Sequence, residues 1–340
     1  MSLCSLIKDI GTKLTLTVSS LTLLANTAFA QLPNDNTKIL VSRSQNRDII
    51  EIVFSEGVFD PDNPESSLKS KIYRLDTQKG AVDLLFYSTD SNIALVKPAY
   101  SEDKKSLAFI NFDYKNKENI EIYVVEPNRS QPRRLTNNNL HEQSFSWSPD
   151  GKKILFVAGS RTDNYTNSIY AINIDGTNEK IVYLNKKGDI SNAVWSKDGK
   201  KIAFDYNIRD ESGIVDEVQI KIMDLNNNNI ITLPGNDVDE VDLSWSPGDK
   251  ILASGFEDDE ESEDRLGLVY SIDPRSGYTE KLAICPESCD SPIWVNNNTI
   301  LVVATYPKLS NYEIYKMDIR SKEPERIYGN EGTIIGLTFK

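Results

Sequence analysis

The feature of this sequence that most limits its fold is a short segment that occurs six times. Each copy spans five positions. A hydrophobic residue is followed by a second position that is usually a tyrosine, then by any residue, a further hydrophobic residue, and an acid or an amide. The copies are SKIYRLD, IEIYVVE, NSIYAIN, VQIKIMD, GLVYSID and YEIYKMD, with Tyr73, Tyr123, Tyr170, Lys221, Tyr270 and Tyr315 in the second position. These positions are 50, 47, 51, 49 and 45 residues apart. Internal repeats of roughly 20 to 50 residues are typical of solenoids and propellers.

A second element precedes this one in five of the six repeats and centres on an aromatic residue. The aromatic residues are Tyr100, Trp147, Trp195, Trp245 and Trp294, which include all four tryptophans of the chain. After Trp147 comes Ser-Pro-Asp-Gly, in which Pro presets φ, Asp bonds to its own backbone and Gly accepts a positive φ. Ser148 and Asp150 also resemble a metal seat or a catalytic acid, but the sixth repeat has Asn296-Asn297-Asn298 here and keeps no carboxylate. We therefore interpret the segment as a hairpin turn.

A third element, a short strand such as PRRLTNN or PERIYGN, follows each tyrosine strand. Each repeat thus has four short strands with period-2 alternation, and no sustained helical period occurs. Four-stranded units at this spacing predict an all-β fold, a six-bladed β-propeller of four-stranded antiparallel blades. Residues 332–340 match the first strand of a blade, and the first repeat begins near residues 48–55. We expect the C-terminal strand to join the N-terminal blade and close the ring, although residues 37–44 could take the same position.

The repeat resembles that of a known protein family. The residues RRLTNN (133–138), WSPDGKKI (147–154) and IYAINIDG (169–176) resemble the TolB-like, WD-repeat-like (PD-type repeat) family of six-bladed β-propellers. The resemblance covers roughly residues 45–340 and implies the fold. The periplasmic members of this family carry an additional N-terminal α/β domain for contacts in the cell envelope, and we expect no room for one between Gln31 and the first blade. Related propellers cap peptidases, whose hydrolase domain we do not expect here.

The N-terminus has the pattern of a secretory signal peptide. Lys8 and Lys13 precede the apolar residues 14–25, and Ala28-Phe29-Ala30 is a small-x-small cleavage site. We predict a signal peptide over residues 1–30, a propeller over residues 31–340, and a periplasmic or secreted protein after cleavage following Ala30. No later apolar run approaches the roughly 20 residues of a membrane-spanning helix, so we expect no membrane insertion.

The net charge and the cysteine and histidine content limit which partners and metal sites are expected. The net charge is −13, and −14 without residues 1–30, so phosphate backbones would be repelled and nucleic acid is not expected as a partner. Cys285 and Cys289 remain after cleavage, and we predict a disulfide between them in an oxidising compartment, with two free thiols as the alternative. His141 is the only histidine, so a multi-histidine metal site is not expected. We predict no cofactor, with a divalent cation left open.

The most distinctive candidate site is an acidic segment between the second and third strands of the fifth repeat. Seven of residues 257–264 are acids, namely Glu257, Asp258, Asp259, Glu260, Glu261, Glu263 and Asp264. In a propeller, the connections between second and third strands emerge on one face, and long polar loops on a rigid scaffold are common binding sites. We predict that this face engages a protein partner associated with the cell envelope; a merely solvated loop is the alternative. The function predicted is an exported, non-catalytic protein-binding scaffold. The alternative function is a metal-dependent propeller hydrolase or lyase with a carboxylate and amide site in the central channel.

Overall fold

The protein is described here from a computed structural model. It describes residues 30–31, 38–39, 51–56, 71–76, 81–88, 90, 93–103, 105–113, 120–127, 132–160, 166–186, 188–209, 215–233, 242–258, 265–285, 288–306 and 311–329. The chain divides into two compact units. Unit 1 comprises residues 1–164 and 170–182, and unit 2 comprises residues 165–169 and 183–340.

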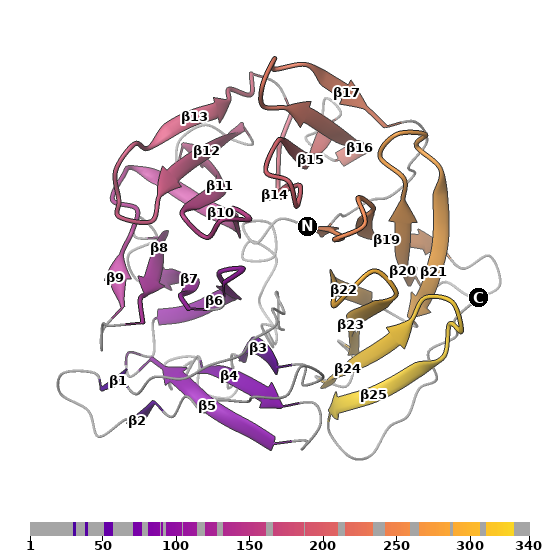
Figure 1. Ribbon diagram of the computed structural model, residues 1–340, viewed down its shortest axis with the longest axis horizontal. Helices are drawn as coiled ribbons and strands as arrows, with labels where there is room; N and C mark the ends of the chain where they lie inside the picture. Colours follow the sequence, from indigo (N-terminus) through magenta and orange to yellow (C-terminus); the bar gives the residue numbers. More distant parts are fainter. Residues whose placement is uncertain are drawn as a thin grey trace. The chain divides into compact units, whose positions relative to one another are not determined.

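Antiparallel sheets with one repeated strand order make up both units (Figure 1). Unit 1 has a three-stranded sheet of β3 (Glu51–Glu56), β4 (Lys71–Asp76) and β5 (Ala81–Tyr87), then a sheet of β6 (Ile93–Tyr100), β7 (Leu107–Asp113), β8 (Ile120–Val125) and β9 (Arg133–Arg134). Its third sheet consists of β10 (Leu140–Trp147), β11 (Lys153–Ser160), β12 (Asn167–Asn173) and β13 (Lys180–Tyr183), and the first residues of β12 belong to unit 2. A two-residue pairing joins β1 (Ala30–Gln31) and β2 (Lys38–Ile39).

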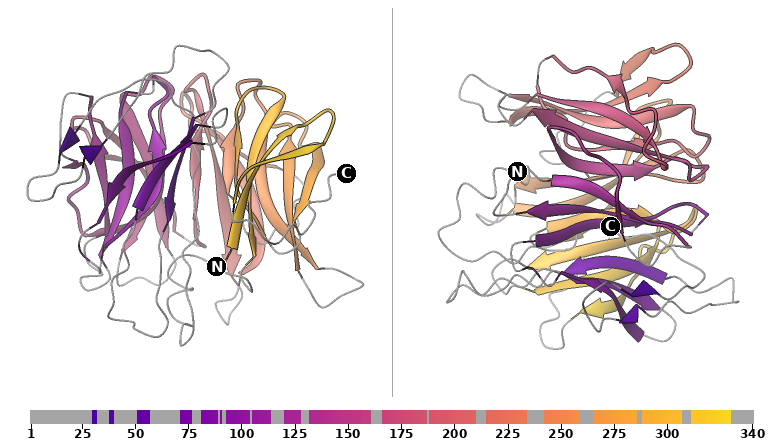
Figure 2. Two further views of the ribbon diagram at one scale, coloured as in Figure 1. Left: turned by 90° about the horizontal axis from the view of Figure 1, so that it is seen from below. Right: turned by 90° about the vertical axis from the view of Figure 1, so that its left-hand side faces the viewer.

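Unit 2 repeats the same order three times. Its sheets are β14 (Ala193–Trp195), β15 (Lys201–Arg209), β16 (Val215–Asp224) and β17 (Ile230–Thr232); β18 (Leu243–Trp245), β19 (Ile251–Asp258), β20 (Arg265–Ile272) and β21 (Thr279–Cys285); and β22 (Ser288–Trp294), β23 (Thr299–Tyr306), β24 (Asn311–Asp318) and β25 (Pro324–Gly329). Figure 2 shows the strong twist of these sheets, which follows from the right-handed twist of each strand.

The fold is an all-β propeller built of four-stranded antiparallel blades. Five four-stranded sheets occur within the described residues, and β3–β5 form a sheet of three strands. The strand predicted at residues 332–340 and its closure of a ring fall outside the residues that the structure describes. In the same described ranges, no helix has the length and apolar character needed to cross a bilayer.

The cores lie between consecutive sheets of a unit. In unit 1, Ile122 and Phe156 belong to one buried cluster that joins β6–β9 to β10–β13. In unit 2, Ile220 and Ile251 belong to a cluster that joins β14–β17 to β18–β21. Alternation along each strand sends side chains to both faces of a sheet, so every inner sheet packs on two neighbours. Each such buried side chain stabilises the fold by about 1.5–3 kcal/mol.

The aromatic position and its turn are structural, as the repeat predicts. Trp147 is the last residue of β10, and its Nε1 donates to the Ala99 carbonyl oxygen at 3.0 Å. In the turn, Ser148 Oγ donates to Asp150 Oδ1 at 2.7 Å and accepts the Lys153 amide at 2.9 Å. The same bonds recur at Ser196 and Asp198 in the next repeat. The bond from Ser148 Oγ, together with one from the Lys152 amide at 3.1 Å, holds the pKa of the Asp150 carboxyl below its usual value, so local hydrogen bonds fix this aspartate as a turn residue.

Candidate functional site

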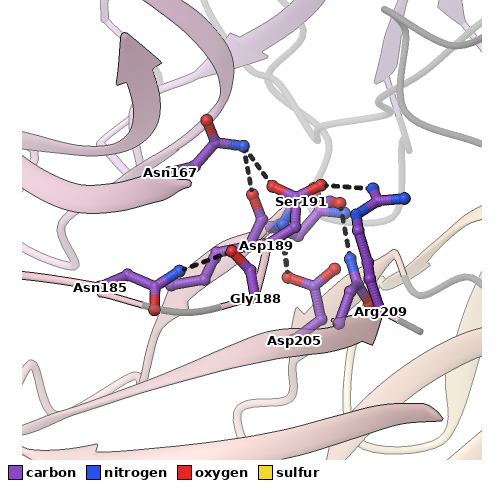
Figure 3. Close-up of polar contacts among 10 residues, drawn as sticks. Asn167, Asn185, Gly188, Asp189, Ser191, Asp205 and Arg209 are labelled. Atoms are coloured by element: carbon purple, nitrogen blue, oxygen red, sulfur yellow. Dashed lines mark hydrogen bonds and ion pairs between the residues drawn. The ribbon is translucent and has the colours of Figure 1, made fainter. Parts of the chain in front are cut away.

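The most developed polar site among the described residues lies in unit 2, at the end of the sheets where strands two and three are connected (Figure 3). Asn167 is the first residue of β12, Arg209 is the last residue of β15, and Asp189 lies between β13 and β14. We call the residues Asn167, Asp189, Ser191, Asp205, Asn207 and Arg209 the Asp189 network. Its members come from three separate segments, and all of them belong to unit 2.

The carboxylate of Asp189 is the centre of the network. Its Oδ2 accepts a hydrogen bond from Arg209 Nη2 at 2.9 Å, and its Oδ1 accepts one from Asn167 Nδ2. The side chain of Asp189 is 2% exposed and that of Arg209 is 18% exposed. Burial raises the pKa of Asp189, and the bond to Arg209 opposes that rise. The ion pair therefore opposes the effect of burial on this carboxyl group.

Asp205 lies on β15 beneath the same segment. Its Oδ1 accepts the backbone amides of Ser191 at 2.9 Å and Asn192 at 2.7 Å, so it anchors the residues that lead into β14. Burial raises the pKa of Asp205 to about 7, and the nearby Asp189 carboxylate also raises it. The carboxyl thus changes its protonation near neutral pH.

Gly188 allows the chain to pass close to β15. The backbones of Asp189 and Asn207 exchange two hydrogen bonds, at 3.0 and 2.8 Å, which form an isolated β-bridge. Gly188 has φ +74°, and a Cβ there would lie 2.6 Å from the Asn207 carbonyl oxygen. Both the positive φ and the close backbone approach favour glycine at this position.

Replacing Gly188 by alanine is expected to destabilise unit 2 by about 2 kcal/mol, because positive φ and a backbone clash both act against the Cβ. Thermal and urea unfolding measure the effect. Gly176→Ala is the matched control, since Gly176 also has a positive φ, +87°, but its Cβ would find its nearest atom at 3.7 Å. An equal loss in the two variants would show that φ alone matters and would contradict the role of the close approach.

The chemistry of the Asp189 network is that of an anchor. Its carboxylates and amides form hydrogen bonds with one another and with backbone groups. These bonds hold the chain where strands begin and end. Among the residues that the structure describes, no three His, Cys, Asp or Glu side chains gather in a group that could hold a metal ion. The network fixes the chain at Asn167, the first residue of β12, and at Arg209, the last residue of β15.

Unit 1 contains a second buried polar cluster, which we call the Glu142 cluster, of Glu121, Arg134, Asn138 and Glu142. Glu121 is on β8 and is paired with Arg134 on β9, while Glu142 is on β10. Glu142 Oε1 accepts from Asn138 Nδ2 at 3.1 Å. Burial raises the pKa of Glu142 to about 8, and the Glu121 carboxylate adds to this rise. One of the two buried carboxyl groups at this junction of two sheets, Glu121, thus has an arginine partner.

The acidic segment predicted from the sequence begins with the last two residues of β19 and continues into the connection to β20. In the backbone register of this hairpin, Glu257 lies opposite Leu266 and Asp258 lies opposite Arg265. Both acids are therefore at the loop-bearing end of their sheet. Asp259, Glu260, Glu261, Glu263 and Asp264 lie outside the described residues, as do the side chains of Glu257 and Asp258. The assignment of this segment as a binding site therefore remains a prediction.

The cysteine prediction concerns the end of β21 and the start of β22. Cys289 is 2% exposed and is disulfide-bonded. Cys285 is the last residue of β21, and its side chain lies outside the described part. The pairing of Cys285 with Cys289 remains a prediction.

Sequence reasoning missed both buried networks, although the repeats contained a signal for one of them. Asp205 is three residues after Ile202, the partner of Trp195 in the β14–β15 ladder. The equivalent positions in the other four-stranded sheets are Ile110, Val157, Ser254 and Val303. A single carboxylate in a position that is otherwise apolar or hydroxyl-bearing marks a special buried environment. Asp189 and Arg209 lie in variable connecting regions and have no such signal.

Comparisons with known proteins agree with the architecture. The chain matches the family model described as TolB beta propeller domain over residues 64–276, more than half of its length. Among solved structures, it is similar to TolB from Acinetobacter baumannii, with a TM-score of 0.58 and 21% identity, covering 77% of this chain and 60% of that chain. It is similar to a putative TolB from Agrobacterium tumefaciens, with a TM-score of 0.59 and 15% identity, covering 77% of this chain and 89% of that one.

A third similar structure is an oligogalacturonate lyase in complex with manganese, with a TM-score of 0.56 and 10% identity, covering 95% of this chain and 88% of that one. At these identities the likeness is one of fold. The chain spans 60% of the length of the Acinetobacter baumannii protein. No curated protein matches the sequence.

Proposed function

Because the chain belongs to the TolB β-propeller domain family, we propose that it is a non-catalytic protein-binding scaffold whose loop-bearing end engages a partner. TolB-like propellers are protein-interaction domains, which supports a protein partner. The proposal includes export, a periplasmic or secreted location after cleavage following Ala30, and a partner at the cell envelope. The contact surface would be the acidic segment that begins at Glu257.

The observation that carries the proposal is the Asp189 network at the loop-bearing end of unit 2. Its buried ion pair and amide bonds fix the ends of the connections at Asn167 and Arg209. The adjacent sheet repeats the same strand order and packs on the first through a shared core, so its hairpin end at Asp258 and Arg265 emerges at the same end. A rigid base under long polar connections is the usual construction of a binding face.

The negative charge of the acidic segment indicates the charge of the partner. The acidic segment contributes seven carboxylates within eight residues, in a chain of net charge −13. Such a surface attracts a basic protein surface and speeds its association, and salt weakens that attraction over a Debye length of about 8 Å at physiological ionic strength. We therefore propose a basic protein partner.

The test replaces the seven acids of residues 257–264 by their amides and compares partner capture from an envelope extract. The unaltered protein is expected to retain a partner in low salt and lose most of it in high salt, whereas the amide variant should retain about tenfold less in low salt. A control carries Glu102→Gln and Glu323→Gln, two exposed acids outside the segment, and should behave like the unaltered protein.

Three results would contradict the proposal. Equal capture by the amide variant would remove the acidic segment from the contact. A loss of the same size in the control would show that the effect is not specific to the acidic segment. Retention of only metal ions or small molecules would favour the alternative, a metal-dependent hydrolase or lyase, which no specific observation in the described residues supports.

A further inference from the structure

The outer strand β17 differs from the outer strands of the other described sheets. Each of those carries at least one charged residue, and these are Asp83 on β5, Arg133 and Arg134 on β9, Lys180 on β13, Glu280 and Lys281 on β21, and Glu325 and Arg326 on β25. In contrast, β17 consists of Ile230, Ile231 and Thr232 and carries none. Residues 225–236, which include it, contain no charged residue at all. Charges on an outer strand normally prevent pairing with another chain, and β17 lacks this protection.

The backbone of β17 has hydrogen-bonding groups directed away from its own sheet. It pairs with β16 through Ile230↔Met223, Ile231↔Ile222 and Thr232↔Lys221. On either side, the Leu233 amide donates to the Ile220 carbonyl oxygen, and the Asp224 amide donates to the Asn229 carbonyl oxygen, both at 2.9 Å. Bonded and non-bonded pairs alternate in an antiparallel ladder. Ile231 therefore points its amide and carbonyl groups to β16, whereas Ile230 and Thr232 point theirs away from the sheet.

The side chains of β17 are apolar and accessible. Ile230 is 39% exposed and Ile231 is 52% exposed, and both are among the few large hydrophobic residues exposed in the described part of the chain. Successive side chains of a strand point to opposite faces, so an added strand would find one isoleucine on each face of the extended sheet. A β-branched residue opposite each isoleucine would bury both.

We propose that β17 is a docking edge for an extended, β-branched segment of a partner protein that is uncharged or basic, and that the segment pairs with Ile230 and Thr232 as a fifth strand. The backbone groups give affinity and the isoleucines give a preference for β-branched side chains. The charge of the segment follows from the chain, because a net charge of −13 repels an acidic peptide. The same repulsion acts against a second copy of this chain as the occupant. This edge is separate from the acidic segment of the proposed function.

The test uses a defined peptide, Lys-Val-Thr-Val-Thr-Val-Thr-Lys, labelled for fluorescence anisotropy and titrated up to about 1 mM, where weak strand addition is measurable. We expect saturable binding. The same peptide with glutamate at both ends should bind about tenfold more weakly. Hydrogen exchange of the Ile230 and Thr232 amides should slow when the lysine peptide is bound.

Two variants and one control separate the edge from general stickiness. Ile230→Pro removes an outward amide without breaking a bond to β16, and Ile231→Lys adds the missing edge charge; each should weaken peptide binding by about tenfold. The control is Ile181→Lys on β13. The exposed fraction of Ile181, 51%, is close to that of Ile231, but Ile181 lies on a strand that already has a lysine. Its peptide binding should not change. Unfolding curves establish that each variant is folded, and if Ile230→Pro is not, Ile231→Lys decides alone.

Four outcomes would overturn the inference. These are no binding of the lysine peptide, unchanged binding by folded Ile230→Pro and Ile231→Lys, an equal loss in Ile181→Lys, and a dimer that Ile231→Lys dissociates while the peptide does not bind. The last would identify a second copy as the occupant. Because the acidic segment is intact in every variant, these outcomes do not depend on the proposed function.

Discussion

Arg209→Met is expected to lower the free energy of unfolding of unit 2 by about 3 kcal/mol. The substitution removes the guanidinium and leaves the Asp189 carboxylate, whose side chain is 2% exposed, without its positive partner. Breaking a buried ion pair from one side is strongly destabilising, because a charge then stays in a medium that solvates it poorly. Urea unfolding measures the loss, and hydrogen exchange of the Asp189 and Asn207 amides locates it.

The double variant Arg209→Met with Asp189→Asn shows the origin of the loss. It removes the orphaned charge and keeps an amide that can still accept from Asn167, so most of the stability should return. The exposed pair Arg275–Asp249 is the matched control, since its nitrogen and oxygen lie 3.2 Å apart and the Arg275 side chain is 79% exposed. Arg275→Met should change stability little, because water screens such pairs. A double variant as unstable as the single one would show that Arg209 acts by packing rather than by charge.

Glu142→Gln is expected to make unit 1 more stable than the unaltered protein above about pH 8, and equally stable near pH 4. Burial, with the Glu121 carboxylate, raises the pKa of Glu142 from 4.5 to about 8. The folded state therefore holds the proton more tightly than the unfolded chain between these values. Stability falls as pH rises through this window, and the full difference is on the order of 5 kcal/mol, at 1.36 kcal/mol for each pKa unit.

The glutamine variant has no proton to lose at this position, so its stability should not fall over the same window. Glutamine keeps the oxygen that accepts from Asn138, so the substitution changes charge with little change of shape. Unfolding free energies measured at several pH values between 4 and 9 give the two curves. Glu323→Gln, an exposed acid, is the control and should follow the unaltered protein. Parallel curves for Glu142→Gln and the unaltered protein would contradict the raised pKa of Glu142.

The repeats in the sequence were sufficient to predict the blades. The position of Trp147 at the end of the first strand, its turn at Ser148 and Asp150, and the tyrosine strand after it all occur as expected. Local rules control these features, because alternation, turn chemistry and strand length are written in short windows. Their sixfold recurrence averages out the ambiguity of any one window.

The two buried networks could not be predicted in the same way. Asp189 and Arg209 are 20 residues apart, and Asn167 is 22 residues from Asp189, with no common spacing in other repeats. Glu121 and Glu142 lie on different sheets of unit 1, and neither has a local pattern that indicates burial. Their burial depends on which sheet packs against them.

By itself, the sequence determined the blade, its strand order and the turn at Ser148, because each of these depends on residues close together in the chain. It also determined the acidic composition and the uncharged stretch around Ile231. Only the tertiary structure decided which charges are buried and paired, and that β17 is the outer strand with free-edge backbone groups. The physical reason is that desolvation and ion pairing depend on distance in space, and the packing of sheets brings together side chains that the sequence keeps far apart.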